Sequence, residues 1–376
     1  MKKIGAFLLA IVLVVAFILP YFQTEDTLPL NEANFRFESA QKYFSVKRGE
    51  DFVFDCLDMK GVDLLQLEIN GANVKTWNLD SNEKQDFSFS TKDLKLGTYS
   101  IELKAFKGDV LKGADGGRFL NVNAEEGPIK RNFDIVATHP HNPENFTQGY
   151  EFYNNVLFES TGNPNQTNAT KVARIDTNTG ASISEVSQPN PIFGEGITIL
   201  ESKIYQISWQ DKKCFIYDVS DLRLIDSMRY DGEGWGLCNN DEYIIMSNGT
   251  NELTVRNPET FEVIETIKVH SDRGPVTNLN ELEYYNGRIY ANIWISEQRK
   301  QFDSRMDLRR IIVINPKSGA VEEYLDIENI IRGSNVQNVP NGIAYRKSSN
   351  SFWITGKYWD KAFELQLTSK NKEDAQ

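Results

Sequence analysis

The most regular feature of the chain is a hydrophobic pattern that recurs five times in its C-terminal part. Each copy begins with a short polar segment, in most cases containing glycine, and continues with hydrophobic strands separated by turns. The copies follow at intervals of 47, 40, 46 and 60 residues, counted between positions 148, 195, 235, 281 and 341, and the last interval holds a charged insertion at 297–310. Four-stranded β-propeller blades repeat about every 40–50 residues. The pattern therefore predicts an all-β fold with a five-bladed β-propeller over residues 131–369.

The last copy supplies only three strands before the chain ends, so a fourth strand must come from elsewhere. Residues 132–137 (Asn-Phe-Asp-Ile-Val-Ala) have the composition and alternation of a strand and lie directly before the first copy. We therefore expect this segment to be the outer strand of the last blade and to close the ring.

Equivalent positions of rotationally related blades form rings around the channel. One ring lies at the start of the first strands and another at the end of the second strands. The first consists of Gln148, Glu195, Trp235, Glu281 and Asn341, and the second of Gly162, Trp209, Asn248, Trp294 and Lys357. Burying carboxylates and a lysine without a function is costly. We therefore expect a functional site at this mouth of the channel, and a purely structural ring is the alternative.

A second all-β region precedes the propeller, at residues 37–125. Its segments 65–69 (Leu-Gln-Leu-Glu-Ile) and 99–103 (Tyr-Ser-Ile-Glu-Leu) alternate between apolar and polar residues, and glycines such as Gly71 and Gly97 separate the strands. This pattern predicts a small immunoglobulin-like β-sandwich. It carries no cluster of catalytic residue types, so a spacer or adhesion role is expected.

Residues 1–22 have the pattern of a signal peptide or a signal anchor. Lys2 and Lys3 precede an apolar run that extends to Pro20, and no small-x-small cleavage site follows. The run is just long enough to span a bilayer with the two lysines inside. The pattern favours a retained anchor over a cleaved peptide, followed by a linker at 23–36. The body is expected outside the cytoplasm, periplasmic or secreted, and tethered to the membrane if the segment is uncleaved.

Composition narrows the classes of function. The net charge of −12 argues against nucleic acid as a partner. The three cysteines are an odd number and suggest small buried side chains rather than a disulfide framework. His139 and His141 form a His-x-His pair, but no third ligand with zinc-site spacing follows, so structural histidines are expected. Any chemistry must therefore rest on carboxylates, lysine and amides.

The residues around the two rings resemble the plant and bacterial type of glutaminyl cyclase, a glutaminyl-peptide cyclotransferase family. The similarity extends over residues 131–367, in order and with the expected spacing. It is carried by Phe146-Thr147-Gln148-Gly149, Phe193-Gly194-Glu195-Gly196-Ile197, Gly234-Trp235-Gly236, Leu279-Asn280-Glu281-Leu282, Asn292-Ile293-Trp294, Asn341-Gly342-Ile343 and Thr355-Gly356-Lys357.

This resemblance implies a five-bladed propeller enzyme, classed as an acyltransferase, that acts without a catalytic metal. It would convert the N-terminal glutamine of peptides or proteins to pyroglutamate and release ammonia. The implied site residues are Phe146, Gln148, Phe193, Glu195, Trp209, Trp235, Asn280, Glu281, Trp294 and Lys357. Departures from the family pattern lie elsewhere, as at Asn142, Asn248, Pro340 and the 297–310 insertion, and concern the rim of the site rather than the reaction.

The residue types fit this chemistry independently. One carboxyl group can take a proton from the attacking amine and return it to the departing ammonia, and Glu195 between two glycines is the candidate. Lys357, together with Gln148 or Asn280, would stabilise the developing oxyanion. Glu281 would bind the cationic N-terminus. An aromatic cage would hold the glutamine in a reactive shape, and it would consist of Phe146, Phe193, Trp209, Trp235 and Trp294.

Two other classes of function remain open at this point. A propeller that only binds ligands or proteins would keep the rings but need not keep Glu195 and Lys357 together. A metal-dependent hydrolase or lactonase would use carboxylates and amides around a central cation, which Glu195, Glu281, Asn280 and Asn341 could supply. No cofactor is expected for the cyclase reaction, and a structural cation in the channel is left open.

Overall fold

The computed structural model describes residues 35–79, 86–164, 170–188, 191–294, 309–333 and 339–368. The regular secondary structure of these residues consists of β-strands and the short helix α2 (Glu328–Gly333), so the predicted all-β class is confirmed. No helix within these ranges is long and apolar enough to cross a membrane. The predicted signal or anchor at 1–22, nearly all of the 23–36 linker and most of the 297–310 insertion lie outside the described residues.

The chain divides into two compact units. The described residues of Met1–Phe44, Asp51–Phe89 and Tyr99–Leu120 belong to the first unit. The second comprises those of Ser45–Glu50, Ser90–Thr98 and Asn121–Gln376.

The N-terminal strands form one five-stranded sheet and two small ones around an aromatic core. Phe37 lies 5.2 Å from Phe44 and 5.3 Å from Phe54 between ring centroids, and these side chains are buried. The five-stranded sheet has the order β2 (Tyr43–Lys47), β9 (Val110–Asn123), β8 (Gly97–Lys107), β5 (Leu64–Ile69) and β6 (Ala72–Asn78), while β3 (Asp51–Phe54) pairs with β7 (Phe87–Ser90) and β1 (Arg36–Phe37) with β4 (Cys56–Leu57).

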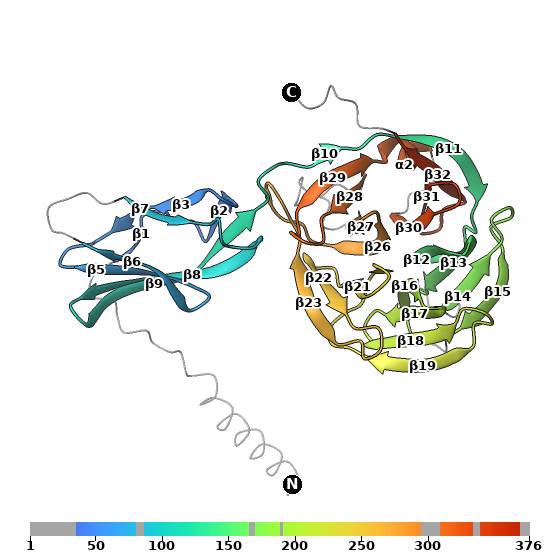
Figure 1. Ribbon diagram of the computed structural model, residues 1–376, viewed down its shortest axis with the longest axis horizontal. Helices are drawn as coiled ribbons and strands as arrows, with labels where there is room; N and C mark the ends of the chain where they lie inside the picture. Colours follow the sequence, from blue (N-terminus) through green and yellow to red (C-terminus); the bar gives the residue numbers. More distant parts are fainter. Residues whose placement is uncertain are drawn as a thin grey trace, which may run out of the picture. The chain divides into compact units, whose positions relative to one another are not determined.

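Five sheets with antiparallel neighbours form most of the second unit, and Figure 1 shows them set around a common centre. The first two consist of β12 (Phe146–Tyr153), β13 (Val156–Gly162), β14 (Lys171–Ile175) and β15 (Ser182–Ser187), and of β16 (Gly194–Leu200), β17 (Lys203–Ser208), β18 (Lys213–Asp218) and β19 (Leu224–Arg229). The third consists of β20 (Leu237–Asn239), β21 (Ile244–Ser247), β22 (Glu252–Arg256) and β23 (Val263–Lys268).

The remaining two sheets each include a strand from the segment before β12. The fourth consists of β26 (Leu279–Tyr285), β27 (Arg288–Ile293), β28 (Arg310–Ile314) and β29 (Val321–Asp326), with β10 (Ile129–Lys130) added in parallel. The fifth consists of β30 (Pro340–Arg346), β31 (Ser351–Gly356), β32 (Lys361–Leu367) and β11 (Phe133–Pro140). A separate short pair is β24 (His270–Ser271) with β25 (Gly274–Pro275).

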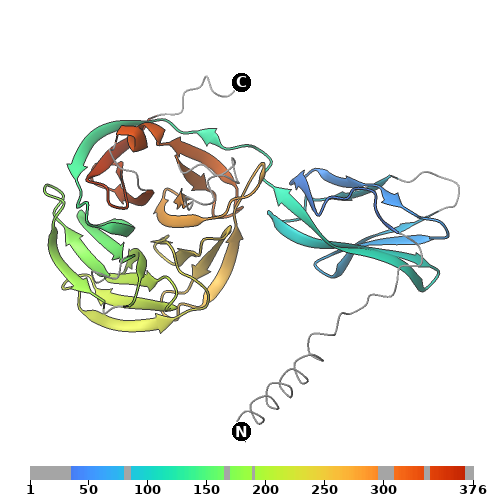
Figure 2. The same cartoon turned by 180° about the vertical axis from the view of Figure 1, so that it is seen from behind.

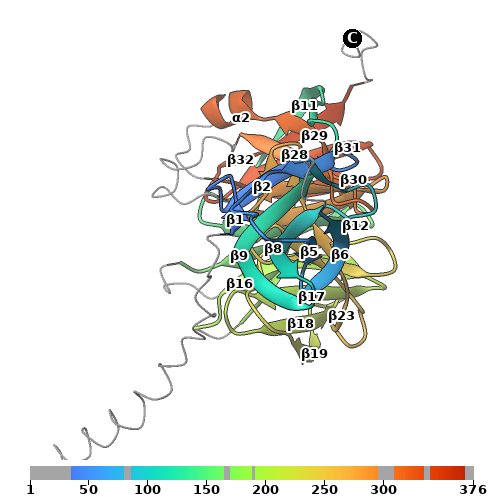
Figure 3. The ribbon, with the colours of Figure 1, turned by 90° about the vertical axis from the view of Figure 1, so that its left-hand side faces the viewer.

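Strand β11 supplies the fourth strand of the fifth sheet, as predicted from the 132–137 segment. It pairs antiparallel with β32, from Phe133 opposite Leu367 to Pro140 opposite Lys361. The innermost strands also form a complete circle of neighbours, because β12 contacts β16, β16 contacts β20, β20 contacts β26, β26 contacts β30 and β30 contacts β12. The circle is seen again from behind in Figure 2, and β17, β18 and β19 lie progressively further from its centre in Figure 1. Figure 3 shows the same three strands edge-on, one below the other.

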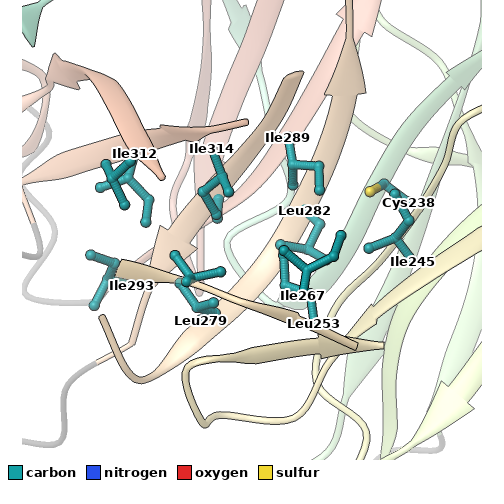
Figure 4. Close-up of a cluster of buried hydrophobic side chains, with 13 residues drawn as sticks. Cys238, Ile245, Leu253, Ile267, Leu279, Leu282, Ile289, Ile293, Ile312 and Ile314 are labelled. Carbon is teal, nitrogen blue, oxygen red and sulfur yellow. The ribbon is translucent and has the colours of Figure 1, made fainter. Parts of the chain in front are cut away.

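Hydrophobic cores fill the spaces between successive sheets rather than the centre of the unit. Figure 4 shows one of them, in which Leu253 and Ile267 of the third sheet face Leu282 and Ile289 of the fourth. Cys238 is buried in the same cluster, as predicted for a small apolar side chain.

The inner strands approach one another too closely for side chains at several positions. A Cβ atom at Gly149 would lie 2.4 Å from the backbone nitrogen of Ile197, and one at Gly196 would lie 2.6 Å from that of Leu237. At Gly236 the nearest atom would be the carbonyl oxygen of Asn280, at 2.0 Å. The space beside Gly196, directly after Glu195, is thus occupied by the next inner strand.

We expect Gly236→Ala to lower the free energy of unfolding of the second unit by about 1–3 kcal/mol or more, because the added methyl group meets backbone that cannot rotate away. Gly287→Asn is the control: nothing lies within 4 Å of its Cβ position, and asparagine tolerates its φ of +74°. Denaturant unfolding followed by tryptophan fluorescence measures both variants. Equal stability of the two would contradict the packing argument.

Candidate active site

Nine of the ten sequence-predicted site residues line one pocket of about 170 Å³ in the second unit. They come from the beginnings of inner strands and the ends of second strands, so all five sheets contribute. The lining residues are Phe146, Gln148, Phe193, Glu195, Trp209, Trp235, Asn280, Trp294 and Lys357. Ligand pockets for drug-sized molecules measure roughly 300–1,000 Å³. This pocket is smaller and suits a group about the size of one amino-acid side chain.

The inner strands are irregular where they reach the pocket. The pairing register shifts between Thr147 and Gly149 in β12 and between Gly194 and Ile197 in β16. A similar shift follows Leu279 in β26. Such bulges bend a strand and turn its side chains away from the regular alternation. In these three strands they determine which residues face the pocket.

Glu195 and Lys357 are the two ionisable groups that line the pocket, and both are buried, with exposed fractions of 5% and 4%. Burial raises the pKa of Glu195 well above its usual value, against the attraction of Lys357 and with a contribution from the negative charge of Glu233. Burial also lowers the pKa of Lys357 to about 8, against the attraction of Glu195. Lys357 can therefore lose its proton close to neutral pH, and Glu195 keeps its proton to a higher pH than an exposed carboxyl group does.

Aromatic rings form the walls around these two groups. Trp235 and Trp294 meet edge to face, with centroids 5.5 Å apart and an interplanar angle of 89°. Phe146 contacts Phe193 in the same way, at 6.0 Å and 83°. The ammonium nitrogen of Lys357 lies 4.5 Å from the centroid of Phe146, a cation–π distance. Interlocked rings of this kind keep the pocket narrow and its lining apolar.

Two amide side chains supply polar groups with different roles. The Nδ2 group of Asn341 donates to Oε1 of Gln148 at 2.9 Å and to the carbonyl oxygen of Thr147 at 3.0 Å. This fixes the Gln148 amide and leaves its nitrogen available to a ligand. The Oδ1 atom of Asn280 is buried and has no hydrogen-bond partner among the described residues. Such an acceptor is costly unless a bound ligand donates to it.

A buried ion-pair network supports the strand that carries Phe146 and Gln148. Glu159 of β13 accepts hydrogen bonds from His141 at 3.1 Å, from Thr147 at 2.7 Å and from Asn145 at 2.7 Å. Burial would raise the pKa of Glu159, but His141 and these hydrogen bonds hold it below its usual value. His141 is thus structural, as expected from the sequence.

No group of three or more His, Cys, Asp or Glu side chains within the described residues is arranged to hold a metal ion. The pocket combines a carboxyl group, an amine, two amides and an aromatic wall. This set can transfer protons and stabilise a developing negative charge on a small bound group.

Comparison with known proteins places this chain in a family. The glutamine cyclotransferase family matches residues 119–367. The chain belongs to this family. A glutaminyl-peptide cyclotransferase of Arabidopsis thaliana is 32% identical over 241 residues, which are 62% of this chain and 71% of that protein. The crystal structure of the Myxococcus xanthus glutaminyl cyclase is similar with a TM-score of 0.57 and 30% identity, and the match covers 65% of this chain and all of that chain.

Glu233 is a residue of the site that the sequence analysis missed. Its Oε2 atom accepts hydrogen bonds from the indole nitrogens of Trp209, at 2.9 Å, and Trp235, at 3.1 Å. Its Oε1 atom accepts from Gln210 at 3.2 Å. Partial burial opposes ionisation, but these donors hold the pKa of Glu233 below its usual value. The available signal was a second carboxylate between two glycines, in Gly-Glu-Gly-Trp-Gly.

Glu281 is the predicted site residue that the structure places elsewhere. It is buried, but it is not among the residues that line the pocket. Its two carboxyl oxygens face the backbone N–H groups of Ile343, at 2.8 Å, and Tyr150, at 3.3 Å. Burial and the neighbouring Glu283 raise its pKa well above the usual value. Glu281 thus links three inner strands. Its carboxyl group faces these strands and not the pocket, so the expected role in binding a cationic amine stays a prediction that this placement does not support.

Proposed function

We propose that this chain is a glutaminyl-peptide cyclotransferase that converts N-terminal glutamine to pyroglutamate and releases ammonia. Membership of the glutamine cyclotransferase family supports this reaction. The observation that carries it is the small pocket in which Glu195 and Lys357 are buried together among aromatic rings. Substrates are peptides or proteins with N-terminal glutamine.

We infer that the second unit is a five-bladed β-propeller, with the catalytic domain at residues 131–369. Five sheets, the circle of contacts between inner strands and the closure of the fifth sheet by β11 support this architecture. The aromatic core and antiparallel sheet of residues 37–125 support an immunoglobulin-like sandwich as a separate domain. The signal or anchor at 1–22 is the basis for an extracytoplasmic location.

Glu195 is proposed to carry the proton through the reaction. The α-amine nitrogen attacks the δ-carbonyl carbon of its own side chain, forming the new C–N bond of the lactam ring. Glu195 takes the proton from the attacking nitrogen and returns it to the side-chain nitrogen as the C–N bond of the amide breaks. The products are the pyroglutamyl peptide and ammonia, and no proton is gained or lost overall.

The environment of Glu195 suits this role. An α-amino group has a pKa of about 8. Burial raises the pKa of Glu195 well above that of an exposed carboxyl group, against the attraction of Lys357 and with a contribution from the negative charge of Glu233. The free-energy difference for moving a proton from the amine to Glu195 is therefore smaller than it would be for transfer to an exposed carboxylate. The reaction needs an amine that is neutral when it attacks, and this smaller difference favours the neutral amine.

Lys357 and the two amides are proposed to hold the reacting group. The charge of Lys357 and the nitrogen of Gln148 would stabilise the oxyanion that forms on the δ-carbonyl, and one well-placed donor is worth about 3–4 kcal/mol. The unpartnered Oδ1 of Asn280 would accept an N–H of the substrate. The aromatic walls would keep water from attacking the same carbonyl and forming glutamate instead.

We propose that catalysis requires no metal, because Glu195 alone can take and return the proton. A structural cation in the channel stays a prediction. A metal-dependent hydrolase or lactonase and a pure binding module are the alternatives, and they differ from the cyclotransferase in chelator sensitivity and in turnover.

Purified full-length protein should convert a Gln-initiated peptide to its pyroglutamyl form with one ammonia released per peptide, and EDTA should leave the rate unchanged. A coupled ammonia assay and mass spectrometry of the peptide measure this. An Asn-initiated peptide is the matched control substrate and should release no ammonia above background, since its shorter side chain would form a strained four-membered ring. Folded protein without turnover would favour the binding module, and loss of turnover in EDTA would favour the metal enzyme.

Glu233→Gln should change both the pH dependence and the affinity. The negative charge of Glu233 raises the pKa of Glu195, so its removal lowers that pKa and moves the acidic limb of the kcat profile to lower pH. Weaker hydrogen bonds to Trp209 and Trp235 should cost about 1 kcal/mol of substrate binding, which raises KM about fivefold. Kinetics from acidic to neutral pH measure both. The control Glu242→Gln should change neither the acidic limb nor KM. An acidic limb that does not move in Glu233→Gln would contradict the effect of the Glu233 charge on the pKa of Glu195.

A further inference from the structure

A second, larger pocket adjoins the active-site pocket in the same unit. Its volume is about 480 Å³, and it shares two lining residues with the active site, Phe193 and Trp209. The rest of its wall includes Pro164, Pro191, Gln210 and Asp211. This volume lies within the range of roughly 300–1,000 Å³ that is usual for ligand pockets.

A peptide substrate needs such a neighbouring space. The active-site pocket of about 170 Å³ has room for the glutamine, so the chain after it must leave past the walls. Trp209 is the wall residue with the most open position, since 38% of its surface is exposed. Because Trp209 faces both pockets, the direction past its indole leads from the glutamine into the second pocket.

The indole of Trp209 is held in place from two sides. Its nitrogen donates to Glu233 at 2.9 Å, and the ring of Phe193 contacts it with centroids 5.8 Å apart. A fixed indole with an exposed face attracts cations. Asp211 adds an exposed carboxylate to the same pocket, and neither Lys212 nor Lys213 is among its lining residues.

We propose that the second pocket binds the residue that follows the N-terminal glutamine and favours lysine or arginine there. This inference rests on the proposed cyclotransferase function and narrows its substrate class. The cation of the side chain would lie against the indole of Trp209 and near the carboxylate of Asp211. Both contacts are solvent-exposed, so their combined effect on kcat/KM is about tenfold.

The test compares three substrates: Gln-amide, Gln-Arg-amide and Gln-citrulline-amide. Citrulline has nearly the shape of arginine but no charge, and Gln-amide has no second residue. The kcat/KM of each dipeptide is divided by that of Gln-amide. We expect the arginine substrate to exceed the citrulline substrate about tenfold, and Asp211→Asn to reduce this ratio about threefold. The control is Asp226→Asn, which changes an exposed aspartate on β19, the outermost strand of the same sheet. It should leave the ratio unchanged.

The outcomes separate this inference from the proposed function. Turnover of Gln-amide together with equal kcat/KM values for the arginine and citrulline substrates would overturn the proposed role of the second pocket. The proposed cyclotransferase function would still stand. An arginine preference that Asp211→Asn does not reduce would also overturn the assignment to this pocket. Absence of turnover with all three substrates would overturn the cyclotransferase function and this inference with it.

Discussion

The close approach of the inner strands is the constraint on which the rest of the second unit depends. Gly149, Gly196 and Gly236 each face the backbone of the next inner strand at distances that exclude a side chain. Each glycine directly follows a residue that lines the pocket. The contacts that narrow the centre of the unit therefore also place Gln148, Glu195 and Trp235 beside one another. A looser ring would give a wider pocket with more water in it.

Burial in this narrow space gives Glu195 and Lys357 their chemical character. The pKa of the carboxyl group rises and that of the amine falls because neither can be fully solvated. Such burial opposes folding, as does the unpartnered oxygen of Asn280. Satisfied polar groups stabilise the same inner strands nearby. Glu159 accepts three hydrogen bonds, and Glu281 accepts from two inner strands.

Sequence reasoning located the strands and six of the nine pocket residues because these follow from periodic patterns. The other three, Phe146, Phe193 and Asn280, came from the resemblance to the family. The last copy supplies only three strands, and this together with the spacing of the copies was enough to predict β11 as the fourth strand. The position of Glu281 outside the pocket lining has a local cause. Asn280 and Glu281 are adjacent on β26, and the register shift there turns Asn280 to the pocket and Glu281 to the backbone of other strands. An alignment of the repeats does not show which of these two neighbouring residues faces the pocket.

Glu233 was missed for a different reason. Its role depends on Trp209, which comes from another sheet, and no local pattern records that the two side chains meet. The resemblance to the family implied the pocket residues but not such supporting contacts. The second pocket beside Trp209 is likewise a product of loops that come together only in the folded chain.

The central claim is that Glu195, and not Glu281, carries the proton. The most direct test is to compare kcat for Glu195→Gln and Glu281→Gln with a Gln-initiated peptide, with folding of both variants checked by circular dichroism. The account predicts that Glu195→Gln loses about 100-fold or more in kcat, while a folded Glu281→Gln stays within about threefold of the wild type. Near-normal turnover in Glu195→Gln with loss of turnover in folded Glu281→Gln would contradict it.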